Sequence, residues 1–218
     1  MIIAIDGPAA SGKSTTAKML ASKLKFIHLN SGIMYRAITY IFIQNNMLNE
    51  TDKYINKFLI KINLKFKGKN LNIVMLDDCD ISDKLYTEEI SKNIRVVSNN
   101  LLIRKKLIKM QRELVNDKNV VCEGRDIGTV VFPKADFKFY LNANLNKRVE
   151  RRFNQIFDKN EQACISEIKE NLIHRDLNDI RREHSPLKKA DDSIEIDTTN
   201  LKINEQVEKI YNIIKIGK

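Results

Sequence analysis

The residues with the clearest chemical signature lie near the start of the chain, in the segment Gly7-Pro8-Ala9-Ala10-Ser11-Gly12-Lys13-Ser14. Two glycines separated by four residues, followed by lysine and a hydroxyl side chain, form a loop whose backbone N–H groups can surround phosphate oxygens. The apolar run at residues 2–5 indicates a buried strand before the loop, and apolar positions at helical spacing indicate a helix over residues 13–24. The loop therefore leads from a strand to a helix N-terminus, where free N–H groups favour a bound phosphate.

The side chains of this loop have separate predicted roles. Lys13 can reach the β- and γ-phosphates of ATP, and the Ser14 hydroxyl can bind Mg²⁺. We therefore expect ATP and Mg²⁺ as cofactors, with Ser14 as the metal ligand. The other residues expected to hold the nucleotide are Gly7, Pro8, Ala9, Ala10, Ser11, Gly12 and Thr15.

Further apolar runs predict the elements that position the loop. Short runs that indicate buried strands occur at residues 26–29, 120–122, 137–141 and 194–196. Together with the first strand they predict an α/β protein of the P-loop NTPase fold, with a five-stranded parallel sheet flanked by helices. Helices are also expected over residues 101–114 and 203–214.

Residues 57–98 follow a different pattern. Ile62, Leu64 and Phe66 alternate with polar residues, and after a polar turn the apolar residues Leu71, Ile73 and Met75 alternate again. Period two with one polar face predicts an antiparallel β-hairpin. We expect a small lobe at residues 57–98, inserted into a core formed by residues 1–56 and 99–218.

Composition narrows the class of protein. The chain has 218 residues, of which 43% are hydrophobic and 30% charged, as in a folded globular protein. No apolar run approaches the roughly 18 residues of a membrane span, and no basic and apolar leader precedes the first strand, so we expect a cytoplasmic protein without a membrane partner. Its three cysteines are widely spaced and its three histidines lack metal-ligand spacing; we expect reduced, mostly buried thiols and structural histidines.

A formal net charge of +10 raises the possibility of nucleic-acid binding. The arginines, however, concentrate in short clusters at residues 148–152 and 175–182, and forked guanidinium groups at discrete points suit the phosphates of a small ligand. We therefore expect no nucleic-acid partner. A nucleic-acid-binding ATPase remains as an alternative, which predicts salt-sensitive binding to RNA or DNA.

Four segments together resemble bacterial cytidylate kinases. They are Ser-Gly-Ile-Met-Tyr-Arg at residues 31–36, Glu-Gly-Arg-Asp-Ile-Gly-Thr-Val-Val-Phe-Pro at 123–133, the Arg-Asp to Pro-Leu segment at 175–187 and Ile-Asp-Thr-Thr at 196–199. The resemblance covers essentially the whole chain in the same order. It implies a nucleoside monophosphate kinase that transfers the γ-phosphoryl group of ATP to CMP or dCMP, giving ADP and CDP or dCDP. It also implies that residues 57–98 bind the monophosphate and that residues 147–166 form a lid.

The resemblance implies a role for each matching acceptor-site residue. Arg36 and Arg125 would hold the acceptor phosphate, and bidentate contacts to a dianion suit both. Ser31, Arg104, Asp126 and Arg182 would read the cytosine, and Arg175 and Asp179 the sugar.

Two consequences follow for acceptor specificity. A carboxylate at Asp126 can accept from the exocyclic amine of cytosine, whereas uracil would leave it unpaired at a cost of about 1–3 kcal/mol. The serine that contacts the sugar in the family falls on Arg95 here, with Ser98 three residues further on. The preference between CMP and dCMP is therefore open.

Three arginines follow the predicted strand at residues 137–141. Arg148, Arg151 and Arg152 stand at helical spacings of three and four, so two or three of them are expected to share a helix face. Such a cluster is often a solvated face, but a lid that closes over ATP is favoured here. Arg148 and Arg152 are then expected to act on the transferring phosphoryl group with Lys13 and Arg125, and Arg151 to bind ATP.

The expected reaction needs no general base, because the attacking phosphate oxygen is already ionised. The protein instead aligns two polyanions and screens their repulsion. Alternatives are another P-loop kinase, acting on adenylate, uridylate or shikimate, in which Asp6 or Asp126 could serve a hydroxyl acceptor, and a non-catalytic nucleotide-binding module. A monomer that acts on small molecules is the expected state.

Overall fold

The computed structural model describes residues 1–158 and 164–217, and its centre is a five-stranded parallel sheet of order β2-β6-β1-β7-β8. The strands are β1 (Ile2–Asp6), β2 (Ile27–Asn30), β6 (Val120–Gly124), β7 (Phe137–Asn142) and β8 (Ile194–Asp197). Five apolar runs predicted these five strands, and the α/β fold class is confirmed. Because the strands are parallel, their carboxyl ends meet at one edge of the sheet, where ligands bind in open α/β folds.

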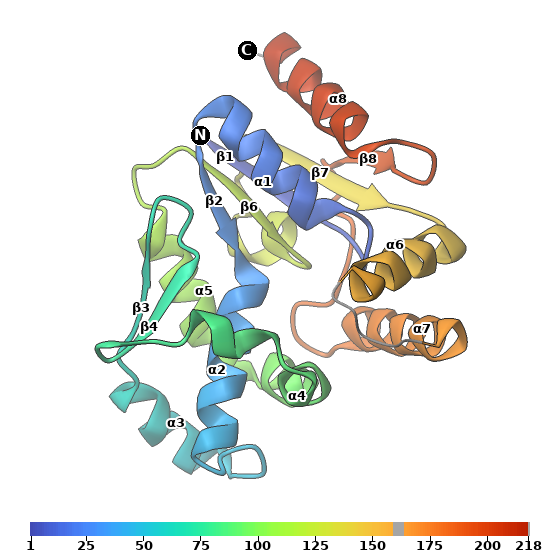
Figure 1. Ribbon diagram of the computed structural model, residues 1–218. Coiled ribbons are helices and arrows are strands. Elements are labelled where there is room, and N and C mark those ends of the chain that lie inside the picture. The colour runs from blue at the N-terminus through green and yellow to red at the C-terminus, as the bar shows by residue number, and fades with distance from the viewer. Residues whose placement is uncertain (159–163, 218) are drawn as a thin grey trace.

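Helices cover both faces of the sheet (Figure 1). α1 (Lys13–Leu24) and α8 (Ile203–Ile216) pack on one face, and α2 (Ser31–Gln44) and α5 (Leu101–Leu114) on the other. Successive residues of β1 point to opposite faces: Ile3 and Ile5 belong to the core beneath α1 and α8, and Ala4 to the core beneath α2. A strand buried on both sides must be apolar at every position, which explains its uninterrupted run.

A second, antiparallel sheet forms the predicted small lobe. It consists of β3 (Leu64–Lys67), β4 (Ile73–Leu76) and the short β5 (Cys79–Asp80). Around it lie α3 (Asp52–Lys61), the 3₁₀ turn η1 (Ser82–Tyr86) and α4 (Glu88–Asn99), three elements that the sequence analysis did not anticipate. The lobe lies to the left of and below the parallel sheet in Figure 1.

The register of the hairpin differs from the alternation read in the sequence. Phe66 pairs with Val74, and both are buried, whereas Ile73 pairs with Lys67 and is exposed. Directly paired residues of antiparallel strands lie on the same face. The expectation that Ile73 belongs to the apolar face was therefore wrong, because the neighbouring residue Val74 takes that place.

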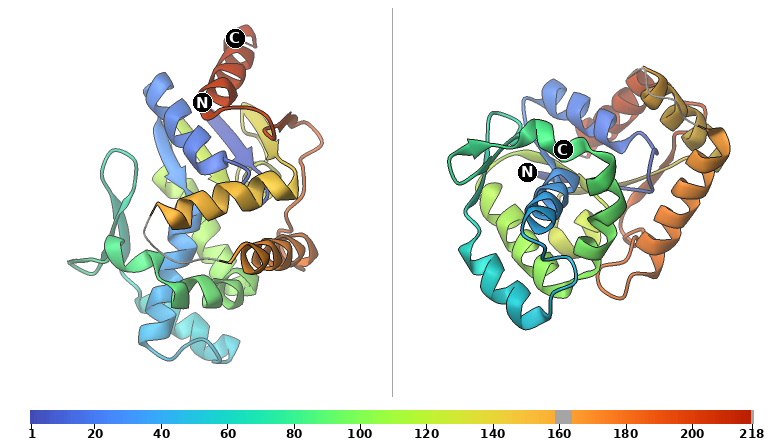
Figure 2. Two further views of the ribbon diagram at one scale, coloured as in Figure 1. Left: turned by 45° about the vertical axis from the view of Figure 1, so that its right-hand side comes forward. Right: turned by 60° about the horizontal axis from the view of Figure 1, so that its bottom comes forward.

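Two helices lie side by side beside the sheet (Figure 2). α6 (Leu145–Phe157) and α7 (Ile165–Arg181) share a small apolar core with Ala9 of the phosphate-binding loop. The range proposed for a lid, residues 147–166, covers most of α6 and the start of α7; residues 159–163 of it lie outside the described residues.

Within the described residues, no helix is long and apolar enough to cross a membrane. The three cysteines are free, but only Cys122 is buried. The expectation of mostly buried thiols was wrong for Cys79, in a two-residue edge strand, and for Cys164, which precedes α7.

Candidate active site

The predicted site residues converge because of the register of three neighbouring strands. Asp6 at the end of β1 pairs with Gly124 of β6, and Asn30 at the end of β2 pairs with Glu123. The phosphate-binding loop, Ser31 and residues 124–126 therefore leave the sheet next to one another. The buried Asp6 fixes this arrangement, since its carboxylate accepts the backbone N–H groups of Ile127 at 2.9 Å and Gly128 at 2.8 Å.

Burial of Asp6 has an electrostatic consequence. Desolvation raises the pKa of this carboxyl to about 6, although the two N–H donors oppose the shift. Asp6 thus anchors the π-helical turn η2 (Ile127–Val131) that follows Asp126.

The phosphate-binding loop needs both of its glycines. Gly7 has φ +154°, and a Cβ there would lie 2.1 Å from the carbonyl oxygen of Leu141 in β7. Gly12 has φ +92°, in the left-handed region, and a Cβ there would meet Gln206 Oε1 at 3.0 Å. These positions tolerate no side chain without displacement of the loop or its neighbours.

The middle of the loop is tied to the surrounding elements. The Ala9 N–H donates to Asp176 Oδ1 at 3.2 Å, and its carbonyl oxygen accepts from Arg148 Nη1 at 3.2 Å. The carbonyl oxygen of the buried Ser11 accepts from Thr198 Oγ1 at 2.9 Å. Helices α6 and α7 and the segment after β8 thus hold the loop. Of the other predicted loop residues, Pro8 is buried, Ala10 has φ +59° and Thr15 is exposed.

Lys13 is buried and folds back over the loop, where its Nζ donates to the Pro8 carbonyl oxygen at 3.0 Å. Burial, reinforced by the nearby positive charge of Arg125, lowers the pKa of Lys13 to about 7. An anionic ligand at this amine would favour its charged form. The side chain is therefore placed to respond to phosphate.

Ser14 lies next to an acidic residue that the sequence analysis left without a role. Its hydroxyl donates to Glu123 Oε2 at 2.7 Å, and Glu123 is the buried residue before Gly124 in β6. A serine hydroxyl that donates its one hydrogen keeps two lone pairs for a cation. The signal that could have identified Glu123 was an apolar strand that ends in a carboxylate.

A buried histidine faces the same carboxylate. His28 Nε2 in β2 is 3.8 Å from Glu123 Oε1. Burial lowers the pKa of His28, although the negative charge of Glu123 opposes the shift. Among the described residues no cluster of three or more histidine, cysteine, aspartate or glutamate side chains has the geometry of a metal site.

The arginines expected at the acceptor phosphate belong to two different elements. Arg36 in α2 donates to the Leu85 carbonyl oxygen at 3.1 Å, and its guanidinium lies 5.2 Å from the ring centroid of Tyr86. Arg125 Nε donates to Asp179 Oδ2 at 2.8 Å. Arg36 is thus held by the small lobe, whereas Arg125 acts on Lys13 of the loop and connects β6 with α7.

The residues expected to read the base form a buried group. Arg104, which is 1% exposed, pairs with Asp126, and its guanidinium lies 5.4 Å from the ring centroid of Tyr35. Arg104 Nη1 also donates to the Ser98 carbonyl oxygen at 3.0 Å, while the Ser31 hydroxyl donates to the Glu123 carbonyl oxygen at 2.8 Å. The structure thus brings Arg104, Asp126 and Ser31 together.

The expected sugar contacts and one further base contact lie on or just after α7. Asp179 accepts from Arg125 and lies 3.7 Å from Arg182, whose Nη2 donates to the Ser185 carbonyl oxygen at 2.7 Å. Burial raises the pKa of Asp179, but Arg125, Arg175 and Arg182 outweigh it, so the pKa lies below its ordinary value. Desolvation by the surrounding protein, together with the positive charge of Arg125, lowers the pKa of Arg175 to about 10. The Arg175 side chain is nevertheless partly in contact with solvent.

The three arginines of α6 have different surroundings. Arg148 is buried and pairs with Asp176, and Arg151 donates to Thr198 Oγ1 at 3.1 Å. Arg152 is exposed, and its positive charge contributes to the lowered pKa values of Arg36 and Arg175. Desolvation by the surrounding protein is the larger cause at both residues. Of the three, Arg152 is thus the exposed one, and its charge acts on Arg36 and Arg175.

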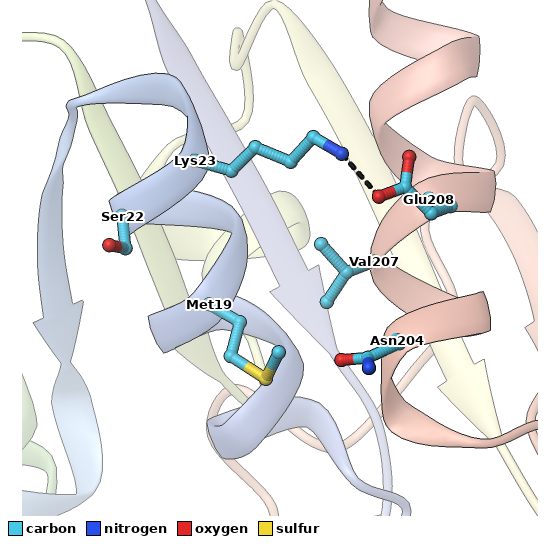
Figure 3. Close-up of a pocket in the computed structure, with 6 residues that line it drawn as sticks. All are labelled: Met19, Ser22, Lys23, Asn204, Val207 and Glu208. Carbon is cyan, nitrogen blue, oxygen red and sulfur yellow. Dashed lines mark hydrogen bonds and ion pairs between the residues drawn. The ribbon is translucent and has the colours of Figure 1, made fainter.

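A surface hollow lies between α1 and α8, where Lys23 and Glu208 form an ion pair (Figure 3). Its lining residues are Met19, Ser22, Lys23, Asn204, Val207 and Glu208. None of the predicted site residues lines this hollow, which is separate from the edge of the sheet described above.

The family model described as cytidylate kinase matches residues 3–216. The chain belongs to the cytidylate kinase family. A cytidylate kinase of Fusobacterium nucleatum is 43% identical over 215 residues, which cover 99% of this chain and 97% of that protein. A cytidylate kinase of Bacillus cereus is 39% identical over 213 residues, or 97% and 95% of the two chains. The resemblance recognised from the motifs is confirmed.

A solved structure supports the fold. The crystal structure of an uncharacterized protein from Eubacterium ventriosum is 12% identical, with a TM-score of 0.52 over 99% of this chain and 98% of the other. At this identity the similarity concerns the fold alone, and the family assignment depends on the sequence matches.

Proposed function

We propose that this member of the cytidylate kinase family transfers the γ-phosphoryl group of ATP to CMP or dCMP, giving ADP and CDP or dCDP. The observation that carries the proposal is the pairing of Asp6 with Gly124. It places the phosphate-binding loop, which follows Asp6, beside Arg125 and Asp126, which follow Gly124. A donor site and an acceptor site thus share one edge of the sheet.

The donor half would bind ATP through the backbone of the loop and through Lys13. Ser14 fits a Mg²⁺ ion, because its hydroxyl oxygen has free lone pairs and stands 2.7 Å from the Glu123 carboxylate, and Mg²⁺ prefers oxygen ligands. Ser14 would hold the metal, which would supply positive charge to offset the charge that develops on the phosphates. Arg151 would contribute to ATP binding from α6.

In the acceptor half, Arg36 and Arg125 would bind the phosphate of CMP. Asp126 would accept from the cytosine amine and Arg104 would donate to the base, since both are held in place by their own ion pair. The further contacts proposed are Ser31 and Arg182 to the base, and Arg175 and Asp179 to the sugar.

The transfer itself would depend on alignment and charge. The attacking oxygen of CMP is ionised, so the protein needs to hold two polyanions in line rather than remove a proton. Lys13, Arg125 and Arg152 would supply positive charge at the transferring group. Arg148 would act where it touches the loop, at the Ala9 carbonyl oxygen. We further propose a cytoplasmic monomer that acts on small molecules and not on nucleic acid.

An acceptor panel tests the proposal. ADP release from ATP is measured with CMP, dCMP, UMP, AMP and shikimate, and CMP or dCMP is expected to be the best acceptor. A higher kcat/KM with any of the other three would overturn the assignment.

The variant Asp126→Asn sharpens this test, because an amide still fills the site beside Arg104 but cannot accept from cytosine in the same way. The ratio of kcat/KM for CMP to that for UMP is expected to fall roughly 5- to 150-fold, which corresponds to a loss of about 1–3 kcal/mol in discrimination. Asp191→Asn, at an exposed carboxylate, is the matched control, and thermal melting verifies that both variants fold.

A further inference from the structure

Two buried polar atoms face each other beside the loop without a partner. His28 in β2 and Glu123 in β6 lie on neighbouring strands, and their side chains are 10% and 3% exposed. The 3.8 Å between His28 Nε2 and Glu123 Oε1 is too long for a hydrogen bond. Within residues 1–158 and 164–217 neither atom has a hydrogen-bond partner. Buried polar groups in folded proteins are nearly always paired, so this gap calls for an explanation.

The other oxygen of the same carboxylate is occupied. Glu123 Oε2 accepts the Ser14 hydroxyl at 2.7 Å. That hydroxyl has one hydrogen and two lone pairs, so the position of the carboxylate decides where the lone pairs of Ser14 point. Whatever holds Glu123 in place therefore also determines how Ser14 presents its oxygen to a cation.

We propose that His28 is a positioning residue for the metal site: its Nε2–H closes the gap to Glu123 Oε1 and fixes the carboxylate that orients Ser14. The inference rests on the proposed binding of Mg²⁺ at Ser14. A cation on the Ser14 oxygen makes the hydroxyl a stronger donor and draws Glu123 Oε2 toward it. The second oxygen then needs a donor of its own, and a shift of about 1 Å brings the imidazole within hydrogen-bond distance.

A residue that hydrogen-bonds to the groups around a metal can alter the metal affinity without touching the metal itself. His28 is buried and reaches the metal ligand only through Glu123, so it should affect the metal-dependent part of nucleotide binding and no other part. A histidine that only fills space in the core would change the stability of the protein and leave the metal dependence alone.

The test measures ATP binding by titration calorimetry at a series of Mg²⁺ concentrations, without acceptor. His28→Leu is expected to raise the Mg²⁺ concentration for half-maximal tightening about tenfold, the lower end of the range for outer-shell substitutions. ATP affinity in EDTA and CMP affinity should remain as in the unmodified protein. His28→Gln, which retains an N–H donor, should recover most of the loss. The exposed His174→Leu is the control and should change nothing.

A double-mutant cycle shows whether the effect passes through Glu123. In the Glu123→Gln background, His28→Leu should change the Mg²⁺ requirement less than twofold. Independent, additive effects would overturn the proposal, as would an unchanged Mg²⁺ requirement in His28→Leu. Should His28→Leu fail to fold, His28→Asn, whose shorter side chain cannot reach the carboxylate, takes its place. The acceptor panel reports separately on the proposed reaction, because the calorimetry requires no acceptor.

Discussion

The low pKa of Lys13 predicts that ATP binding takes up a proton. Burial and the charge of Arg125 lower the pKa of this amine to about 7 in the protein alone. Phosphate oxygens around Nζ favour the charged form and bring the pKa back toward its usual value of roughly 10. At pH 8 the amine is about 10% protonated before binding and almost fully protonated after it, so about 0.9 proton is taken up per ATP. At pH 7 the uptake falls to about 0.5.

Titration calorimetry in buffers of different ionisation enthalpy measures this number directly, as the slope of the binding enthalpy against the buffer enthalpy. Lys13→Met should bind ATP more weakly, without a loss of thermal stability, and should lose the uptake at pH 8. Lys25→Met, at an exposed position after α1, should retain it. No proton uptake by the unmodified protein at pH 8, or equal uptake by Lys13→Met, would refute the reasoning.

Three further predictions concern the fold and the sugar site. Asp6 has a raised pKa of about 6, so its contribution to stability is present below pH 3.8 and is lost as the pH rises through 6. Asp6→Asn should remove this loss, so the destabilisation that the substitution causes, measured by urea unfolding, should be about 2 kcal/mol smaller at pH 7 than at pH 4. Gly7→Ala should destabilise the protein by about 3 kcal/mol in the same assay, because its Cβ would lie 2.1 Å from the Leu141 carbonyl oxygen; an effect no larger than that of Gly32→Ala would contradict this. Arg95→Ser should change the CMP to dCMP ratio of kcat/KM by up to about tenfold, the worth of one hydrogen bond to a sugar hydroxyl, and a change below twofold would count against a sugar contact at this position.

The phosphate-binding loop and the parallel sheet were predictable because their signals are local. The spacing of Gly7, Gly12 and Lys13 is a property of eight consecutive residues, and a strand buried on both faces needs an uninterrupted apolar run. Helix α5 at Leu101–Leu114 was predicted to the residue for a similar reason.

Elements of the small lobe were harder to predict. α4 does carry a helical signal, since Ile90, Ile94 and Val97 stand at helical spacing and pack on the core, but the sequence analysis read only the period-two pattern of this segment. β5 has only two residues and no periodicity. The pairing Phe66–Val74 depends on the turn between the strands, so alternation alone did not fix which of the two faces of β4 is buried.

The pairing of side chains in the site could not be read from spacing at all. The spacing of the arginines around Arg148 predicted a shared helix face, but it could not predict that Arg148 and Arg151 bond to Asp176 and Thr198, which are distant in sequence. Glu123 stood in a recognised motif, yet its contact with Ser14 joins residues 109 positions apart. Such contacts follow from tertiary packing, and the assigned roles of the site residues remain proposals.

Three arginines of the proposed acceptor site already have anionic partners: Arg104 is paired with Asp126, and Arg125 and Arg182 flank Asp179. At these three arginines an entering nucleotide meets charges that carboxylates already balance, and not bare cations with mobile counterions. Fewer small ions are released on binding than the number of arginines suggests, and counterion release is what makes an affinity depend on salt. The affinity for the acceptor should accordingly vary less with ionic strength than that of a surface with the same number of free guanidinium groups, so acceptor binding should persist as the salt concentration changes.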